Sequence, residues 1–192
     1  MNEKQRIRTS KFLSLILRHE PERIGLKLDQ SGWIGVEMLL DACRKHGMLL
    51  KQADLEEVVA TNEKKRFAFS EDGRQIRASQ GHSVEVALGY PPQPPPRELF
   101  HGTATRFLDA IRKEGLCKGA RHHVHLSSDA ETAQKVGHRH GKPVVLIVRT
   151  AEMQTRGHAF FLSENGVWLT ESVPAEFIVF PDQPTIAEQP RA

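Results

Sequence analysis

Residues 121–127, Arg-His-His-Val-His-Leu-Ser, alternate polar with apolar side chains and gather groups that bind protons, metals or anions. This alternation predicts a β-strand, because successive side chains on a strand point to opposite faces. Val124 and Leu126 then face a core. The opposite, chemically active face carries Arg121, His123, His125 and Ser127.

Three interpretations fit this polar face. It is the solvent side of a half-buried strand, or a metal site in which His123 and His125 reach one ion, or an anion clamp at Arg121. A zinc site needs further ligands, and no CxxC, HExxH or paired acidic motif supplies them. A guanidinium group matches phosphate oxygens in a bidentate way. The segment alone leaves the choice open.

The overall composition sets the size and class of the protein. A chain of 192 residues, 39% of them hydrophobic, is long enough for one compact domain or two small ones. Its 27 Lys and Arg residues exceed its 24 Asp and Glu residues only slightly. Global charge therefore decides little about nucleic acid, and any basic patch must be local.

Targeting and redox features point to one compartment. The cysteines, Cys43 and Cys117, are far apart in sequence, which argues against a disulfide framework. Residues 1–10 are polar and show no signal-peptide pattern, and no apolar run approaches the ~20 residues of a membrane helix. We expect a soluble, monomeric, cytoplasmic protein.

A proline-rich run at residues 91–96, Pro-Pro-Gln-Pro-Pro-Pro, divides the chain. Such a run forms neither helix nor ladder and prefers a stiff, extended conformation. We therefore expect a lobe at 1–90, a linker at 91–96 and a lobe at 97–182. Residues 183–192 are expected to form a flexible tail.

The first lobe predicts three helices and a hairpin. Apolar residues at helical spacing end just before Pro21, so Arg18, His19 and Glu20 lie at the end of the first helix. The second helix begins near Val36 and is capped at Gly47. The third helix begins near 54 with a capping-box pattern, and residues 66–70 and 74–77 form the hairpin. This order is typical of a winged helix.

The parity of the hairpin assigns its faces. We expect Phe67, Phe69 and Ile76 to face the core. The side chains on the outer face are then Arg66, Gln75 and Arg77. Two arginines on one exposed face make either a phosphate cradle or a solvated wing. The pattern does not choose between them.

The second lobe predicts an α+β arrangement with a split or bent sheet. Strands are expected at 99–103, 121–127, 144–148, 159–162, 167–170 and 177–180, with helices after 106 and 128. No GxGxxG or GxxxxGK[ST] motif occurs, so neither a Rossmann dinucleotide fold nor a P-loop is supported.

Six segments together resemble the NAD-dependent RNA 2′-phosphotransferases, also called tRNA 2′-phosphotransferases. They occur in the order of that family between Lys11 and Phe180, nearly the whole chain. The segments are residues 13–21, 65–67, 76–83, 101–103, 121–127 and 163–170.

The resemblance implies a winged-helix lobe joined to an ADP-ribosyltransferase-like lobe, with NAD as co-substrate and no metal. In the implied reaction an internal RNA 2′-phosphate attacks the nicotinamide-bearing ribose carbon of NAD, giving an ADP-ribosylated RNA phosphate. The neighbouring ribose hydroxyl then attacks phosphorus and releases 2′-OH RNA and ADP-ribose 1″,2″-cyclic phosphate. The implied catalytic residues are Arg18, His19, Arg66 and Arg121.

These residue types suit that chemistry. A phosphate nucleophile is already ionised at neutral pH, so its attack needs no general base. The site must instead hold a dianion and stabilise charge during transesterification, which positioned Arg and His groups do. The resemblance also implies residues at the cofactor, which are His101, Gly102, Thr103, Ser127, Gly137, Arg139 and Phe160. Residues expected at the RNA surface are Arg77, Gln80, His82 and Ser83, with bracing of the lobe interface as an alternative for Gln80 and His82.

Two other functions remain open from the sequence. One is NAD-dependent ADP-ribosylation of terminal phosphates of nucleic acids, which stops after the first step. The other is a winged-helix DNA-binding regulator whose histidine-rich second lobe senses a metal or a small ligand.

Overall fold

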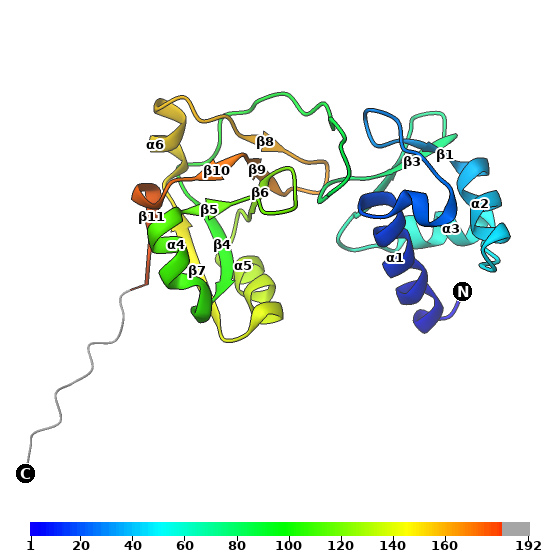
Figure 1. Ribbon diagram of the computed structural model, residues 1–192, viewed down its shortest axis with the longest axis horizontal. Helices are drawn as coiled ribbons and strands as arrows, with labels where there is room; N and C mark the ends of the chain where they lie inside the picture. The colour runs from blue at the N-terminus through cyan, green and yellow to red at the C-terminus, as the bar shows by residue number, and fades with distance from the viewer. Residues whose placement is uncertain (182–192) are drawn as a thin grey trace, which may run out of the picture.

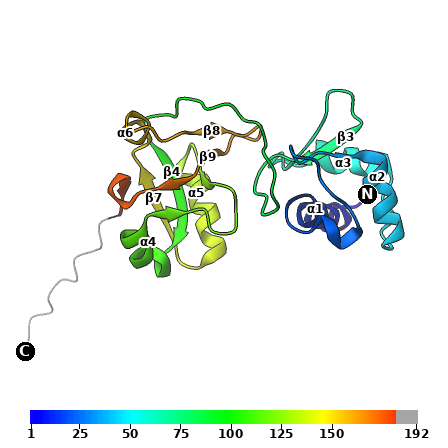
Figure 2. The same cartoon turned by 45° about the horizontal axis from the view of Figure 1, so that its top comes forward.

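The computed structural model describes residues 1–181, which form two lobes side by side (Figure 1). The predicted tail at 183–192 lies outside the described residues, as does the last residue of the predicted second lobe. The turned view shows the same separation of the lobes (Figure 2). Within residues 1–181, no helix combines the length and the apolar character that crossing a membrane requires.

The first lobe contains the expected helices and hairpin. Its antiparallel sheet has the order β1-β3-β2, and Phe69 of the hairpin pairs with Ile76. Its elements are α1 (Glu3–Arg18), β1 (Ile34–Gly35), α2 (Val36–Lys45), α3 (Gln52–Ala60), β2 (Phe67–Phe69) and β3 (Gln75–Ala78). The predicted start of α3 was two residues late. Asp54 sits inside the helix, where its carboxylate accepts from the backbone N–H of Lys51 at 3.1 Å.

The second lobe is an α+β arrangement with a split sheet, as expected. One sheet has the order β11-β7-β4 and another β6-β9-β8, and an isolated bridge between Phe100 and Ser127 joins them. A short pair, β10-β5, lies beside them. The strands are β4 (Leu99–Ala104), β5 (Leu116–Cys117), β6 (Val124–Leu126), β7 (Pro143–Val148), β8 (Phe161–Leu162), β9 (Trp168–Thr170), β10 (Ser172–Val173) and β11 (Ile178–Val179). The helices are α4 (Leu108–Glu114), α5 (Ala130–Gly137) and α6 (Thr150–Thr155).

Residues 1–181 pack around two separate hydrophobic cores. One core draws on residues from Leu13 to Ala78, and the other on residues from Leu99 to Ile178. No cluster of buried apolar side chains joins these two cores within the described residues.

The strand predicted at 121–127 is shorter than expected. Val124 and Leu126 are buried, which confirms the predicted parity. Arg121 lies in the bend before β6, where its N–H donates to the carbonyl of Lys118 at 3.1 Å. The bend frees Arg121 from the sheet and leaves its side chain exposed.

The proline-rich run also differs from the expectation. Instead of forming no ladder, it pairs with the second lobe through a bridge between Pro92 and Phe161 and an N–H bond from Gln93 to the carbonyl of Phe160 at 2.8 Å. The Thr150 hydroxyl donates to the carbonyl of Pro96 at 2.5 Å. The non-proline residue, Gln93, supplies the N–H that makes this pairing possible.

Close packing of α5 on β4 depends on two glycines. A Cβ on Gly102 would lie 1.6 Å from the carbonyl oxygen of Ala133, and one on Gly137 would lie 2.6 Å from the carbonyl oxygen of Thr103. No real Cβ approaches so closely. Helix and strand backbones therefore touch at these two positions, and only glycine fits there.

We predict that Gly102→Ala lowers the free energy of unfolding by about 3 kcal/mol or more, because α5 must move off β4. Gly35→Ala is the control, since its added Cβ would meet only the Met38 side chain at 3.7 Å. Urea unfolding of both variants measures the difference. Equal effects would contradict the backbone contact.

Candidate active site

Arg18 stands at the end of α1 and is the most enclosed cation of the site. Its Nη2 lies 3.5 Å from the carbonyl oxygen of Arg66, to which it donates. Its own carbonyl accepts from the N–H groups of Ser83 and Val84 at 2.9 and 3.4 Å. Burial, together with the charges of Arg66 and Arg121, lowers the pKa of Arg18 to about 10. Like charges from three segments therefore meet here.

Arg66 is held by Asn62, a residue that the sequence analysis did not single out. The Asn62 Oδ1 accepts from the backbone N–H of Arg66 at 3.4 Å and from its Nη1 at 3.3 Å. The Asn62 amide in turn donates to the Ser10 hydroxyl of α1 at 3.1 Å. An asparagine in a polar loop has no periodicity or motif that would reveal this role.

The backbone before Arg66 is strained. Lys65 has φ of 40°, in the left-handed region that residues with a Cβ rarely adopt. The Ser79 hydroxyl donates to the Lys65 carbonyl at 2.8 Å, and Asn165 of the second lobe donates to the Lys64 carbonyl at 3.1 Å. Such strain persists only where the surroundings over-determine it. These bonds fix the direction in which Arg66 leaves the backbone.

Arg121 reaches the site from the second lobe. It is the first residue of the stretch 121–127, called the histidine segment below. Its Nη1 lies 3.4 Å from the His125 Nδ1. Because a guanidinium only donates, Nδ1 must accept and Nε2 of His125 carries the proton. That buried Nε2 has no partner within the described residues.

His101, on β4, has a fixed tautomer. Its Nδ1 lies 3.1 Å from the carbonyl oxygen of His125, which can only accept, so Nδ1 carries the proton. Burial is the main reason that the pKa of His101 is lowered, so the ring stays neutral near pH ~7. Its Nε2 is therefore an acceptor, suited to a hydroxyl donor.

The site carries excess positive charge. Burial lowers the pKa of Arg66 and of Lys64, and in both cases the charge of Arg139 lowers it further. Arg139, just beyond α5, thus faces the first lobe. None of the five cations of this cluster forms an ion pair with a carboxylate in residues 1–181: Arg18, Lys64, Arg66, Arg121 and Arg139. A bound anion would balance the positive charge of these five side chains.

His19 and Ser83 lie together at this site. The His19 Nδ1 is 2.9 Å from the Ser83 hydroxyl oxygen. Partial burial, followed by the charges of Arg18 and Arg121, lowers the pKa of His19. The structure thus brings together all four residues predicted to be catalytic.

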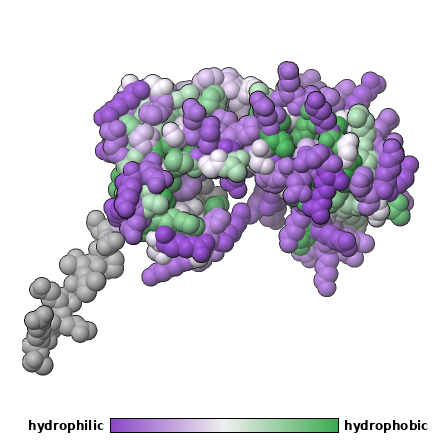
Figure 3. All heavy atoms as spheres, viewed as in Figure 1, coloured by the Kyte–Doolittle hydropathy of each residue, from purple (hydrophilic) through white to green (hydrophobic). Residues whose placement is uncertain are grey.

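A groove extends from this cluster along α1. It encloses about 580 Å³ and runs from Arg18 and Arg66 past Lys11 to Arg6. Ser10, Ser14 and Asn62 add hydrogen-bonding groups to its wall. The space-filling view shows a hollow between the lobes bordered by hydrophilic side chains (Figure 3).

Arg77 does not lie on an exposed surface, contrary to the parity expectation. It points away from the first core as predicted, but neighbouring groups from both lobes surround it, so that it is only 8% exposed. It forms an ion pair with Glu164, and its guanidinium carbon lies 4.4 Å from the centre of the Trp33 ring and 5.8 Å from that of Tyr90. Arg77 therefore links the two lobes through its ion pair with Glu164.

Several residues predicted at the cofactor have structural explanations. Gly102 and Gly137 allow the contact between α5 and β4, and Phe160 is buried in the second core. Thr103 is buried as well, and the backbone of Ser127 bridges to Phe100. These positions give no direct support to a cofactor contact. His101 and Arg139 keep side-chain groups directed to the site.

Within the described residues, no group of three or more His, Cys, Asp or Glu side chains is arranged to hold a metal ion. His82 and the half-buried Gln80 lie on the segment that follows β3. The side chain of His82 is fully buried, and neither ring nitrogen has a partner in residues 1–181.

Comparison with known proteins identifies the family of this chain. The family described as RNA 2′-phosphotransferase, Tpt1 / KptA family, matches residues 4–172. The chain belongs to this family. It is 54% identical over 178 residues to the RNA 2′-phosphotransferase of Escherichia coli strain K12, covering 92% of this chain and 97% of the relative. It is 56% identical over 178 residues to a probable RNA 2′-phosphotransferase of Burkholderia lata, covering 92% of each chain.

Membership in the RNA 2′-phosphotransferase family identifies the chain as a transferase and confirms the resemblance drawn from the six segments. The match includes Arg18, Arg66 and Arg121, which the structure gathers from α1, the residue before β2 and the bend before β6. Lys64 was missed, although its place two residues before Arg66 in a basic run was visible in the sequence.

Buried neutral histidines predict a stability that depends on pH. Burial, with the charge of Arg18 or Arg121 as the next cause, lowers the pKa of His82 and of His125 from 6.5 to about 3. Between these values the unfolded chain binds more protons, so stability falls as pH falls below 6.5. Each histidine contributes a loss of about 2 kcal/mol between about pH 6.5 and about pH 5.

Urea unfolding across that range measures the slope, and His82→Phe should reduce it by about one proton. An unchanged slope in His82→Phe would show that the ring is not neutral and buried.

Proposed function

We propose that the protein removes an internal 2′-phosphate from RNA by transferring it to NAD. The products are RNA with a 2′-hydroxyl, ADP-ribose 1″,2″-cyclic phosphate and nicotinamide. The observation that carries the proposal is the convergence of Arg18, Arg66 and Arg121, without paired carboxylates in residues 1–181, in a chain of the RNA 2′-phosphotransferase family. We further propose that the lobes are a winged-helix lobe and an ADP-ribosyltransferase-like lobe.

The charge of the site matches the nucleophile. A phosphate monoester is mostly a dianion at neutral pH, and its oxygen attacks carbon without losing a proton first. What it needs is a fixed position close to other phosphates, against their mutual repulsion. Arg18 and Arg121, from opposite lobes, supply charge and donors on two sides of such an anion.

Bound NAD would supply a ribose carbon that loses nicotinamide as the RNA phosphate oxygen bonds to it. The residues present fit this co-substrate, because His101 offers Nε2 as an acceptor and a ribose hydroxyl is a donor. Arg139 adds a cation that can face the pyrophosphate. These two residues would hold the ribose and the phosphate part of NAD.

The second step forms a bond from the adjacent ribose oxygen to phosphorus and breaks the bond from phosphorus to the RNA 2′ oxygen. One proton passes from the attacking hydroxyl to the departing RNA oxygen. His19 suits this transfer, because its lowered pKa keeps the ring neutral and able to accept. The arginines balance the charge that develops on the phosphate oxygens.

Incubation of the protein with a 2′-phosphorylated oligonucleotide and NAD tests the reaction. Nicotinamide and ADP-ribose cyclic phosphate should appear in equal amounts. A stable adduct on the RNA would instead favour ADP-ribosylation that ends after the first step. Absence of both products would refute the proposed function.

We predict that Arg66→Ala and Arg121→Ala each lower turnover at least about 100-fold, because each removes a donor to the phosphate in the transition state. Arg121 is exposed, so its loss should leave the thermal unfolding midpoint nearly unchanged. Arg74→Ala, in the exposed turn of the same hairpin as Arg66, is the matched control and should keep normal turnover. Turnover at the normal rate in both test variants would refute the clamp.

A further inference from the structure

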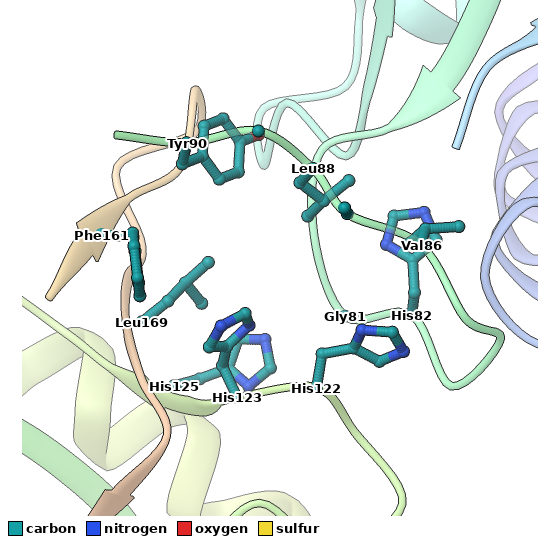
Figure 4. Close-up of a pocket in the computed structure, with 12 residues that line it drawn as sticks. Gly81, His82, Val86, Leu88, Tyr90, His122, His123, His125, Phe161 and Leu169 are labelled. Atoms are coloured by element: carbon teal, nitrogen blue, oxygen red, sulfur yellow. The ribbon is translucent and has the colours of Figure 1, made fainter. Parts of the chain in front are cut away.

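A cavity lies between the lobes and takes no part in the chemistry described above. It has a volume of about 190 Å³ and is formed by the segment 81–90 on one side and by the histidine segment, β8 and β9 on the other (Figure 4). Both lobes contribute to its walls, and the ion pair of Arg77 with Glu164 links the lobes.

The cavity has one apolar, aromatic end and one polar end. Tyr90, Phe161 and Leu169 gather at one end, whereas the rings of His82 and His122 lie with Val86 at the other (Figure 4). Phe161 stands against the His123 ring, with centroids 5.5 Å apart. A cavity with aromatic and apolar side chains at one end and hydrogen-bonding groups at the other suits a planar heterocycle.

The polar end contains a group that needs a partner. His82 is 1% exposed, and both its ring nitrogens lack a hydrogen-bond partner in residues 1–181. A neutral imidazole has one donor and one acceptor, and leaving a buried polar group unpaired is unfavourable. The two nitrogens point in divergent directions, so a donor or acceptor on a ligand edge would pair with one of them, and nucleobase edges carry both kinds of group.

The cavity opens beside the arginine cluster. A Cβ on Gly81, in its wall, would lie 3.7 Å from the Arg18 Nη1, and His125, also in its wall, lies 3.4 Å from the Arg121 Nη1. A phosphate held by Arg18 and Arg121 therefore has the cavity next to it. In a nucleotide, the base is attached to the ribose carbon adjacent to the one that carries a 2′-phosphate.

We propose that this cavity binds the nucleobase of the RNA nucleotide whose 2′-phosphate is removed, with the base between the aromatic wall and His82. The proposal rests on the proposed function, since it places that RNA at the arginine cluster. The base anchors the nucleotide at one end while the arginines hold its phosphate at the other. RNA recognition often combines stacking of an unpaired base with hydrogen bonds to its edge.

Electrostatics favours an RNA base over the nicotinamide of NAD. The nicotinamide ring of NAD is a cation, and the cations Arg18 and Arg121 lie at one side of the cavity. At the other side, Arg77 lies over the Tyr90 ring, and its charge is balanced by Glu164. A neutral base avoids this repulsion.

Two matched oligonucleotides test the proposal, one intact and one without the base at the nucleotide that carries the 2′-phosphate. Their binding to the full chain, measured by fluorescence anisotropy without NAD, should differ by about tenfold or more in favour of the intact RNA. Equal binding of the two would overturn the proposal. Turnover with NAD is scored separately, so that a failure of the proposed reaction is distinguished from a failure of base recognition.

Variants locate the effect in the cavity. Ala87→Trp places an indole on the cavity wall and should remove most of the preference for the intact RNA. Glu85→Trp, at an exposed position on the same segment but outside the cavity, should keep the full preference. Retention of the preference in Ala87→Trp would place the base elsewhere and overturn the proposal.

His82→Phe keeps a ring but removes both nitrogens. It should weaken binding of the intact RNA several-fold while leaving the abasic RNA unchanged, whereas a merely structural role would change both equally or neither. An increased KM for NAD in Ala87→Trp, with no change in RNA preference, would assign the cavity to nicotinamide and overturn the proposal.

Discussion

Repulsion among like charges is the constraint on which this structure depends. Arg18, Arg66 and Arg121 come from distant parts of the chain. Burial is the main cause that lowers the pKa of Arg18 to about 10, and the charges of Arg66 and Arg121 lower it further. Two unit charges several ångströms apart repel by about 1 kcal/mol or more, depending on the local dielectric. Folding must hold these groups together before any anion arrives, and an anionic substrate relieves the repulsion. Binding of an anionic substrate therefore also balances the positive charge of the three arginines.

The lobes are held together at the site by polar contacts, not by a shared apolar core. The turn between β8 and β9 reaches the first lobe, where Glu164 pairs with Arg77 and Asn165 donates to the Lys64 carbonyl (Figure 1). The same turn thus stabilises the interface and braces the strained backbone before Arg66. A polar interface of this kind orients the cations of each lobe toward the site.

Packing within the second lobe positions the side chains that this lobe contributes to the site. Contact of α5 with β4 at Gly102 and Gly137 places Arg139 where its charge reaches Arg66 and Lys64. The bond from His101 to the carbonyl of His125 links β4 to β6 and determines which His101 nitrogen accepts. Gly102 and Gly137, which the sequence analysis expected at the cofactor, thus have a structural role. The packing that they allow positions Arg139 at the site.

Local pattern was enough for much of this protein. Helical spacing predicted α1 and its end at Arg18, and alternation predicted the burial of Val124 and Leu126, because both depend on neighbours in the chain. The motif segments predicted the family, because each is a short run of residues that can be read directly from the sequence. Only the tertiary structure decided that Arg77 is buried, that Asn62 holds Arg66 and that His82 faces a cavity between lobes. Periodicity shows which face of an element meets its own core, but it carries no information on which outer face a distant lobe will cover.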